Sequence, residues 1–93
     1  MYKLNVTYSA KSEEDIHKFY GEVREAGIVE ATRGEDGCVR YDYFFSAERE
    51  NEILLVENWK DQESQKYHDT LPHLETLGKI KEKYGIETGF EEV

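Results

Sequence analysis

Three stretches of the chain alternate apolar and polar residues, which is the pattern of a β-strand with one buried face. They cover residues 2–8, 39–45 and 86–91. A fourth stretch, residues 53–59, begins with four apolar residues in a row, so it predicts a strand that is apolar on both faces. The helices of so small a domain can cover one of these faces. The other face needs a further cover, and a second copy of the chain would provide it.

Apolar residues recur at helical spacing after the first predicted strand. Ser12 and Asp15 resemble a capping box at the start of this segment. We expect one helix that runs to about Arg33 and ends at Gly34. Gly27 lies inside that helix, where a glycine costs up to about 1 kcal/mol relative to alanine, and it is the expected position of a bend.

Two further helices are predicted between the last two strands. Asp61 fits the N-cap of a short helix that reaches Asp69. Pro72 fits the first turn of a second helix, which ends at Gly85. The break between the two helices lies near Thr70. The predicted order of elements is therefore βαββααβ.

Length and charge limit the classes of function. The chain has 93 residues and no repeat, low-complexity tract or linker, so we expect one domain, residues 1–93. Acidic residues outnumber basic ones 21 to 12, and the net charge of −9 disfavours binding to nucleic acid or to an anionic membrane. No stretch approaches the roughly 20 apolar residues of a membrane span, and residues 1–10 contain no signal-peptide run. We expect a cytoplasmic protein with neither of those partners.

An ordered set of motif residues extends through the middle of the chain. The set is Glu35, Gly37, Cys38 and Tyr41, then Glu57 and Trp59, then His68, and finally Thr70, Pro72 and His73. In this order the residues resemble the antibiotic biosynthesis monooxygenase domain family. In that family an acidic residue, any residue, Gly-Cys, two residues and Tyr precede a Glu-x-Trp strand end and a downstream His. Leu71 departs from the pattern, because it lengthens the family's Thr-Pro-His segment by one residue.

The resemblance implies a fold and an assembly. The fold is an α+β, ferredoxin-like βαββααβ domain with an antiparallel sheet, which packs face to face with a second copy to form a dimeric α/β barrel. A homodimer agrees with the separate argument from the apolar residues of the strand at 53–59. An interface of this kind buries upward of about 1,200 Å² in total.

Several of the motif residues are candidates for chemistry. His68 is the candidate catalytic base, because imidazole exchanges protons near neutral pH. His73 lies in the first turn of a helix, where the positive end of the helix dipole favours neutral imidazole. Its candidate role is to orient a ligand. His17 lies among charged residues and is the weakest candidate of the three histidines.

The remaining candidates would bind a substrate. Trp59 is a candidate wall for a flat aromatic ligand. Tyr41 and Tyr43 share one face of their strand and are candidate hydrogen-bond donors. Asn5 is a candidate because an asparagine of the first strand contacts the ligand in the family's haem-degrading branch. Each of these residues also has a plain structural explanation, as part of the core or of the sheet.

No cofactor and no metal are expected. The chain contains no phosphate-binding loop or dinucleotide fingerprint, and its three scattered histidines lack metal-ligand spacing. The haem-degrading branch has a tryptophan at the position of His68 and a histidine at the position of Gly78, so the resemblance argues against haem. Cys38, the only cysteine, cannot form an internal disulfide and is expected to be a small buried residue.

Three functions remain open at this point. The resemblance favours a cofactor-independent monooxygenase that acts on a small quinol or phenol through base-assisted ionisation and direct reaction with O2. An isomerase of a small oxygenated metabolite could use the same histidine and tyrosine groups for proton transfer. A non-catalytic dimeric module for ligand binding or stress response is the third possibility.

Overall fold

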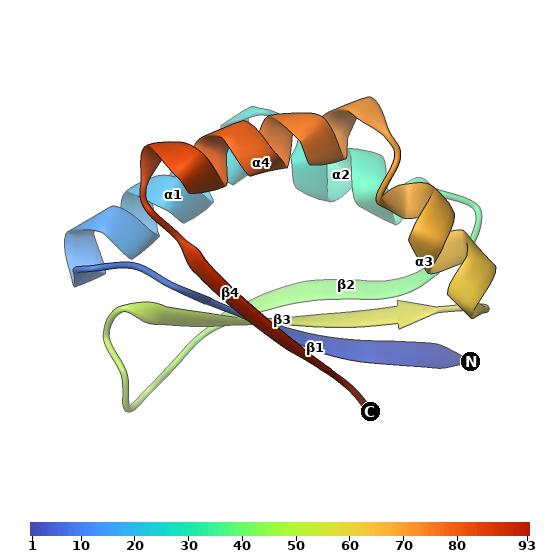
Figure 1. Ribbon diagram of the computed structural model, residues 1–93, viewed down its shortest axis with the longest axis horizontal. Coiled ribbons are helices and arrows are strands. Elements are labelled where there is room, and N and C mark those ends of the chain that lie inside the picture. Colours follow the sequence, from blue (N-terminus) through green and yellow to red (C-terminus); the bar gives the residue numbers. More distant parts are fainter.

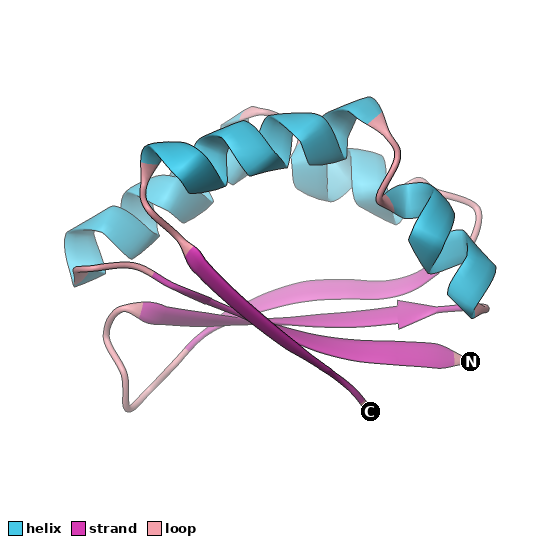
Figure 2. Ribbon diagram, in the orientation of Figure 1, coloured by secondary structure: helices cyan, strands magenta, loops and turns pink.

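The computed structural model describes residues 1–93 and consists of one four-stranded sheet with four helices. In chain order the elements are β1 (Tyr2–Ser9), α1 (Glu13–Glu25), α2 (Ile28–Arg33), β2 (Cys38–Phe45), β3 (Glu52–Trp59), α3 (Gln62–His68), α4 (Pro72–Lys83) and β4 (Glu87–Glu92). The strands are antiparallel and lie in the order β2-β3-β1-β4. All four helices cover the same side of the sheet (Figures 1 and 2). The predicted α+β, ferredoxin-like architecture is confirmed.

The core lies between the sheet and the helices. Alternation along β1 directs Leu4 and Val6 toward the helices, and β3 contributes Ile53 and Leu55 to the same layer. From the helical layer, α1 contributes residues that are completely buried, among them Phe19. Burial of each such side chain contributes roughly 1.5–3 kcal/mol, which fixes the helices on this face.

The helix expected to run without interruption to Arg33 is in fact two helices. Gly27 has φ of +74°, a left-handed conformation that ends α1 and starts α2 in a new direction. The new direction buries Ile28 and Val29 completely. The bend was therefore predicted at the right residue, but the chain breaks into two helices there. The local pattern does not show this, because the break is stabilised by the burial of side chains that come after it.

The opposite face of the sheet has no cover within the chain. Phe44 and Leu54 are paired neighbours on this face, with 44% and 36% of their surface exposed. The prediction that β3 has apolar residues on both faces is thus correct, since Ile53 and Leu55 are buried on the inner side. None of the helices has the length and apolar character that a membrane crossing requires.

Candidate active site

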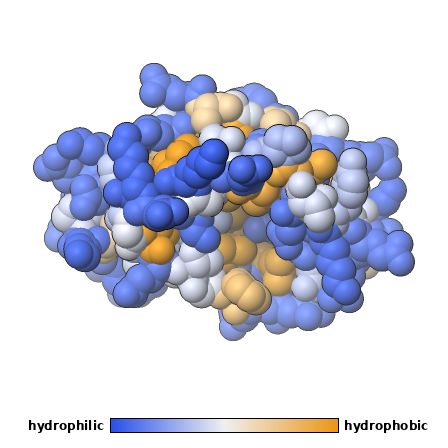
Figure 3. Space-filling view, turned by 45° about the horizontal axis from the view of Figure 1, so that its top comes forward, coloured by the Kyte–Doolittle hydropathy of each residue, from blue (hydrophilic) through white to orange (hydrophobic).

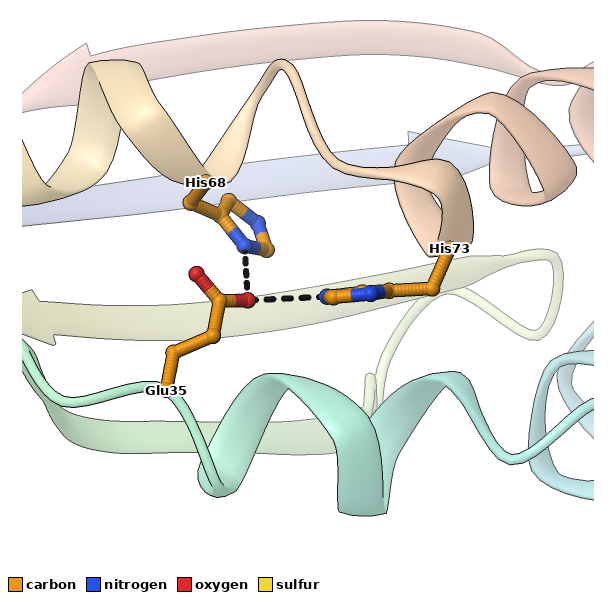
Figure 4. Close-up of side chains that lie close together, drawn as sticks. All are labelled: Glu35, His68 and His73. Atoms are coloured by element: carbon orange, nitrogen blue, oxygen red, sulfur yellow. Dashed lines mark hydrogen bonds and ion pairs between the residues drawn. The ribbon is translucent and has the colours of Figure 1, made fainter.

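Three side chains from three elements meet on one oxygen atom (Figure 4). Glu35 lies in the turn between α2 and β2, His68 is the last residue of α3, and His73 is in the first turn of α4. Oε2 of Glu35 accepts from Nδ1 of His68 at 2.7 Å and from Nε2 of His73 at 2.8 Å. Because a carboxylate oxygen only accepts, this network assigns the proton of neutral His68 to Nδ1. The unprotonated nitrogen of His68 is then Nε2.

Local sequence explains how Glu35 reaches α3. At Gly37 the turn packs so closely on α3 that a Cβ atom would overlap the side chain of Ser64. The amide of Lys60, just after β3, donates to the carbonyl of Gly37 at 2.9 Å and fixes the turn to the sheet. The glycine of the Glu-x-Gly-Cys motif is therefore required for this close approach.

The break between α3 and α4 places the two histidines. Leu71 is extended (φ −80°, ψ 152°) and acts as the N-cap residue of α4, and Pro72 begins that helix. Thr70 closes the preceding turn by donating its hydroxyl to the carbonyl of Tyr67 at 2.7 Å. As a result His68 and His73 face each other across the break, with ring centroids 5.9 Å apart.

The same three residues are the groups most capable of holding a metal ion. Their candidate ligand atoms lie within 4.8 Å of one another, and two imidazoles with one carboxylate form a donor set suited to Zn²⁺ or Fe²⁺. Metal-binding histidines usually donate their second ring nitrogen to a carboxylate or carbonyl. Neither His68 nor His73 has such a second partner. The arrangement fits a carboxylate that orients two imidazoles better than it fits a metal centre.

A cavity of about 290 Å³ lies between the sheet and the helices α3 and α4. Figure 3 shows apolar residues in a hollow that hydrophilic side chains surround. Eight of the 14 lining residues are hydrophobic, and three of these eight are tyrosines, Tyr2, Tyr8 and Tyr41. The other polar side chains of the lining belong to Glu57, Gln65, His68, Asp69 and Lys81. The cavity thus combines an apolar container with a few polar groups, as small-molecule sites do.

His68 presents its free nitrogen to this cavity. The side chain is 2% exposed and lines the cavity, and its Nδ1 is held by Glu35. The only buried side-chain polar atom that is sealed off without a hydrogen bond is Oγ1 of Thr32. Nε2 of His68 has no hydrogen-bond partner in the protein and is not sealed off, and we infer that it opens to the cavity that His68 lines. An acceptor nitrogen in this position can take a proton from a bound ligand.

Trp59 packs against the ring of His68 and does not line the cavity. It is completely buried on the inner face of β3, and its ring centroid lies 4.6 Å from that of His68. Its indole Nε1 donates to Oε1 of Glu57 at 3.0 Å. The expected contact between Trp59 and a ligand therefore has no support in the geometry, and Trp59 instead positions two residues that do line the cavity.

Glu57 can take part in proton transfer, although it was not among the site residues predicted from the sequence. Its side chain is buried on the inner face of β3 and lines the cavity. Burial raises the pKa of Glu57 to about 7, the indole of Trp59 lowers that pKa in part, and the negative charges of Asp69 and Glu35 raise it further. The available signal was its position on β3 between Leu55 and Trp59, which places a carboxyl group on a buried face.

The other predicted binding residues are divided between the two faces of the sheet. Tyr41 lines the cavity, and its hydroxyl lies 3.4 Å from that of Tyr43, which lies behind it and does not line the cavity. Burial raises the pKa of Tyr41 well above its usual range, so it remains a neutral donor. Asn5 lies on the opposite face, where it lines a shallow hollow with Thr7 and Leu54. The structure does not bring Asn5 together with His68.

Lys81 of α4 also lines the cavity and was not a predicted site residue. It has no ion-pair partner, and its Nζ lies 5.2 Å from the ring centroid of Tyr8. Burial lowers the pKa of Lys81. Helical spacing could place Lys81 on the inner side of α4, but the sequence does not show that a cavity lies beneath it.

Cys38 is half-buried beside Tyr41 and not fully buried as expected. Burial raises the pKa of its thiol to about 11, so the thiol remains protonated at neutral pH. A protonated thiol is a weak nucleophile. Cys38 therefore takes no part in the chemistry considered below.

Comparisons with known proteins agree with this architecture. Residues 1–78 match the family model described as antibiotic biosynthesis monooxygenase. The chain is 33% identical over 48 residues to YcnE of Bacillus subtilis (strain 168), a candidate monooxygenase, and the match spans 52% of this chain and about half (50%) of YcnE.

Solved structures show the same fold at low sequence identity. A candidate antibiotic biosynthesis monooxygenase from Deinococcus radiodurans has a TM-score of 0.87 at 22% identity, covering 100% of this chain and 90% of that one. SnoaB, a cofactor-independent oxygenase from Streptomyces nogalater, has a TM-score of 0.74 at 9% identity, covering 99% of this chain and 89% of that one. At these identities the likeness shows a common fold.

Glu57 makes stability depend on pH in a direction that can be tested. Its pKa is about 7 in the folded state against an ordinary 4.5, so the folded protein binds the proton more tightly. Between these pH values the folded state holds more protons than the unfolded state, and stability must fall as pH rises. The full loss above pH 7 is about 3 kcal/mol at 1.36 kcal/mol per unit.

We expect Glu57→Gln to remove this part of the pH dependence. Urea unfolding at pH 5 and at pH 8 should show a larger loss of stability for the wild type than for the variant. Glu52→Gln is the control, because Glu52 is half-buried at the start of the same strand, where it pairs with Arg49 away from the cavity, and it should behave as the wild type does. Equal losses for the wild type and Glu57→Gln would show that Glu57 ionises normally in the folded protein.

Proposed function

The chain belongs to the antibiotic biosynthesis monooxygenase family, and we propose that it oxygenates a small phenol or quinol with dioxygen and without a bound cofactor. The observation that carries this proposal is the free Nε2 of His68, which opens to the cavity while Glu35 holds Nδ1. The reaction begins when that nitrogen takes the proton of the substrate hydroxyl. SnoaB, which shares this fold, is described as a cofactor-independent oxygenase, and this description supports the proposal.

Proton removal is the step that the site must assist. A phenolic hydroxyl has a pKa near 10, so its ionisation at pH 7 costs roughly 4 kcal/mol. Glu35 contributes because its negative charge stabilises the imidazolium that His68 becomes, and because it fixes the tautomer that can accept the proton. The resulting phenolate is electron-rich and can pass an electron to dioxygen, so the substrate performs the role of a redox cofactor.

The cavity also contains groups that suit the phenolate. Lys81 is the only basic side chain other than His68 in the lining, and it has no carboxylate partner to satisfy it. Its ammonium group can attract the oxygen that loses its proton. Tyr41 can donate its hydroxyl to a ligand oxygen. The apolar lining from β1 and α4 accommodates the ring and keeps water away from the reacting atoms.

An isomerase of a small oxygenated metabolite is the second candidate. The observation that favours it is the presence of a buried carboxyl group, Glu57, in the same cavity as His68, because a base and an acid together can move a proton within one ligand. Turnover without oxygen would identify this activity. A non-catalytic module is less consistent with the open Nε2 of His68, since a structural histidine would have both nitrogens bonded or exposed to bulk solvent.

We also propose that two copies pair through the uncovered face of the sheet. Phe44 and Leu54 form an exposed apolar pair on this face, where the edge strand β2 meets β3, and β1 lies next to β3 in the same sheet. Contact with a second copy would remove this apolar area from water, which is the main favourable term in association. The small molecule would then bind on the inner side of each sheet and the partner protomer on the outer side.

Oxygen uptake with menadiol tests the proposed reaction. We expect the wild type to consume oxygen faster than menadiol does by autoxidation, and His68→Ala to lose about 10²–10⁴-fold of the enzymatic rate. His17→Ala is the matched control, because His17 is exposed on α1 and does not line the cavity. An unchanged rate in His68→Ala would contradict the role of His68 as the base.

Chelation with EDTA should leave the rate unchanged, and a loss that Zn²⁺ or Fe²⁺ restores would contradict a cofactor-free reaction.

Sedimentation of the purified protein tests the pairing. We expect the wild type to sediment as a dimer and Leu54→Asp to sediment as a monomer, because a charge would be buried against the partner. Tyr67→Asp changes an exposed aromatic residue on the helical side and should leave the dimer intact. A monomeric wild type at tens of micromolar concentration would reject the proposal.

A further inference from the structure

We propose that Glu57 is the acid of this site, and that its carboxyl group donates a hydrogen bond to the bound ligand and then a proton to the oxygen atom that the reaction reduces. This inference rests on the proposed oxygenation and deepens it, since it assigns the proton donor for the steps that follow phenolate formation. Glu57 would thus be a second catalytic residue, which acts in the same cavity as His68.

The position of Glu57 supports this role. The residue pairs with Leu4 across β1 and β3, so its side chain points to the inner face. It is 6% exposed, and it lines the cavity. Oε1 accepts the indole hydrogen of Trp59 at 3.0 Å, and no other group bonds the carboxyl. Oε2 has no hydrogen-bond partner and is not sealed off, and we infer that it opens to the cavity that Glu57 lines.

The surroundings of Glu57 favour the protonated form. A buried carboxylate is costly unless a cation pairs with it, and Glu57 takes part in no ion pair. Burial raises the pKa of Glu57 to about 7, so a large fraction of the molecules hold the proton at neutral pH. Several titratable or charged groups surround Glu57. They are Tyr8 of β1, Tyr41 of β2, Glu35 of the turn between α2 and β2, His68 and Asp69 at the end of α3, and Lys81 of α4.

A separate proton donor is needed because His68 cannot hold the substrate's hydroxyl proton and at the same time donate a proton to the peroxide. Glu35 fixes His68 as an acceptor, and after the first step His68 carries the substrate proton. The peroxide that forms when dioxygen adds to the ring needs a proton of its own. Glu57 is the group in the lining that can supply that proton while His68 holds the first one.

The resulting sequence of steps balances. His68 takes the hydroxyl proton, the phenolate gives one electron to O2, and the two radicals combine to form a bond between a ring carbon and oxygen. Glu57 protonates the peroxide oxygen and becomes a carboxylate. This carboxylate then removes the hydrogen of the same ring carbon as a proton. A carbonyl forms at that carbon as the O–O bond breaks and hydroxide leaves. The hydroxide takes the proton of His68 and becomes water. The phenol and O2 yield a quinone and water, and both residues return to their starting states.

The arrangement also limits the class of ligand. Two acidic side chains, Glu57 and Asp69, line the cavity beside a single lysine, Lys81. An anionic ligand would face both carboxyl groups, whereas a neutral phenol can accept from protonated Glu57 and donate to His68. We therefore expect neutral phenols and quinols to bind more tightly than aromatic carboxylates of the same size.

Glu57→Gln separates the acid role from the hydrogen bond. The amide of glutamine still donates a hydrogen bond but cannot transfer a proton. We expect menadiol turnover to fall at least 10²-fold, while the dissociation constant for 1-naphthol changes less than threefold. In the wild type the rate should fall as pH rises through about 7, because Glu57 loses its proton, and this decline should be absent from the residual rate of Glu57→Gln. Glu52→Gln should match the wild type in every respect.

Two results would overturn the inference. One is wild-type turnover by Glu57→Gln with the decline above pH 7 retained. The other comes from infrared difference spectra of the ligand-free wild type and Glu57→Gln at pH 6, in which the carbonyl band of a protonated carboxyl group must appear. Absence of this band would reject Glu57 as the acid whether or not menadiol is a substrate. If the band appears and no menadiol is consumed, the oxygenation proposal fails and the assignment of Glu57 as a protonated donor stands.

Discussion

One oxygen atom, Oε2 of Glu35, connects the three segments that form the candidate site. It accepts from an imidazole at the end of α3 and from an imidazole at the start of α4, at 2.7 Å and 2.8 Å. Hydrogen bonds to a charged acceptor contribute about 1.5–3 kcal/mol each, which is more than neutral ones provide. This contact ties the turn after α2 to the break between the last two helices, and it sets the tautomer of His68. The cavity-facing nitrogen of His68 is a consequence of it.

Two carboxyl groups in different surroundings give the site its division of labour. Glu35 accepts from two ring nitrogens and serves as the negative partner of an imidazole. Glu57 has a single indole donor and no cation, and burial raises its pKa to about 7. Environments that differ in this way allow one acid residue type to act as an electrostatic partner in one place and as a proton donor in another. His68 is hydrogen-bonded to Glu35, and its ring packs on Trp59, whose indole is hydrogen-bonded to Glu57.

Periodicity and motif order predicted most of the fold and part of the site. The strands were predictable because alternation reports directly which face is buried, and the break near Thr70 was predictable because Pro72 can begin a helix but not continue one. The division of the first helical region at Gly27 depends on packing that the local pattern does not contain. The roles of Glu57 and Lys81 were missed because the cost of burying a charge appears only when the surrounding side chains are known. Asn5 was assigned by resemblance, and its register on β1 turns it away from the cavity.

The proposed base chemistry depends on the tautomer of His68, which nuclear magnetic resonance can determine. Long-range ¹H–¹⁵N correlation spectra of the uniformly ¹⁵N-labelled protein, recorded at a pH where the imidazoles are neutral, distinguish the protonated ring nitrogen from the bare one. We expect that His68 carries its proton on Nδ1 and leaves Nε2 bare, and that Glu35→Gln loses this preference. A wild-type His68 with the proton on Nε2 would rule out His68 as the base, because no acceptor nitrogen would then face the cavity.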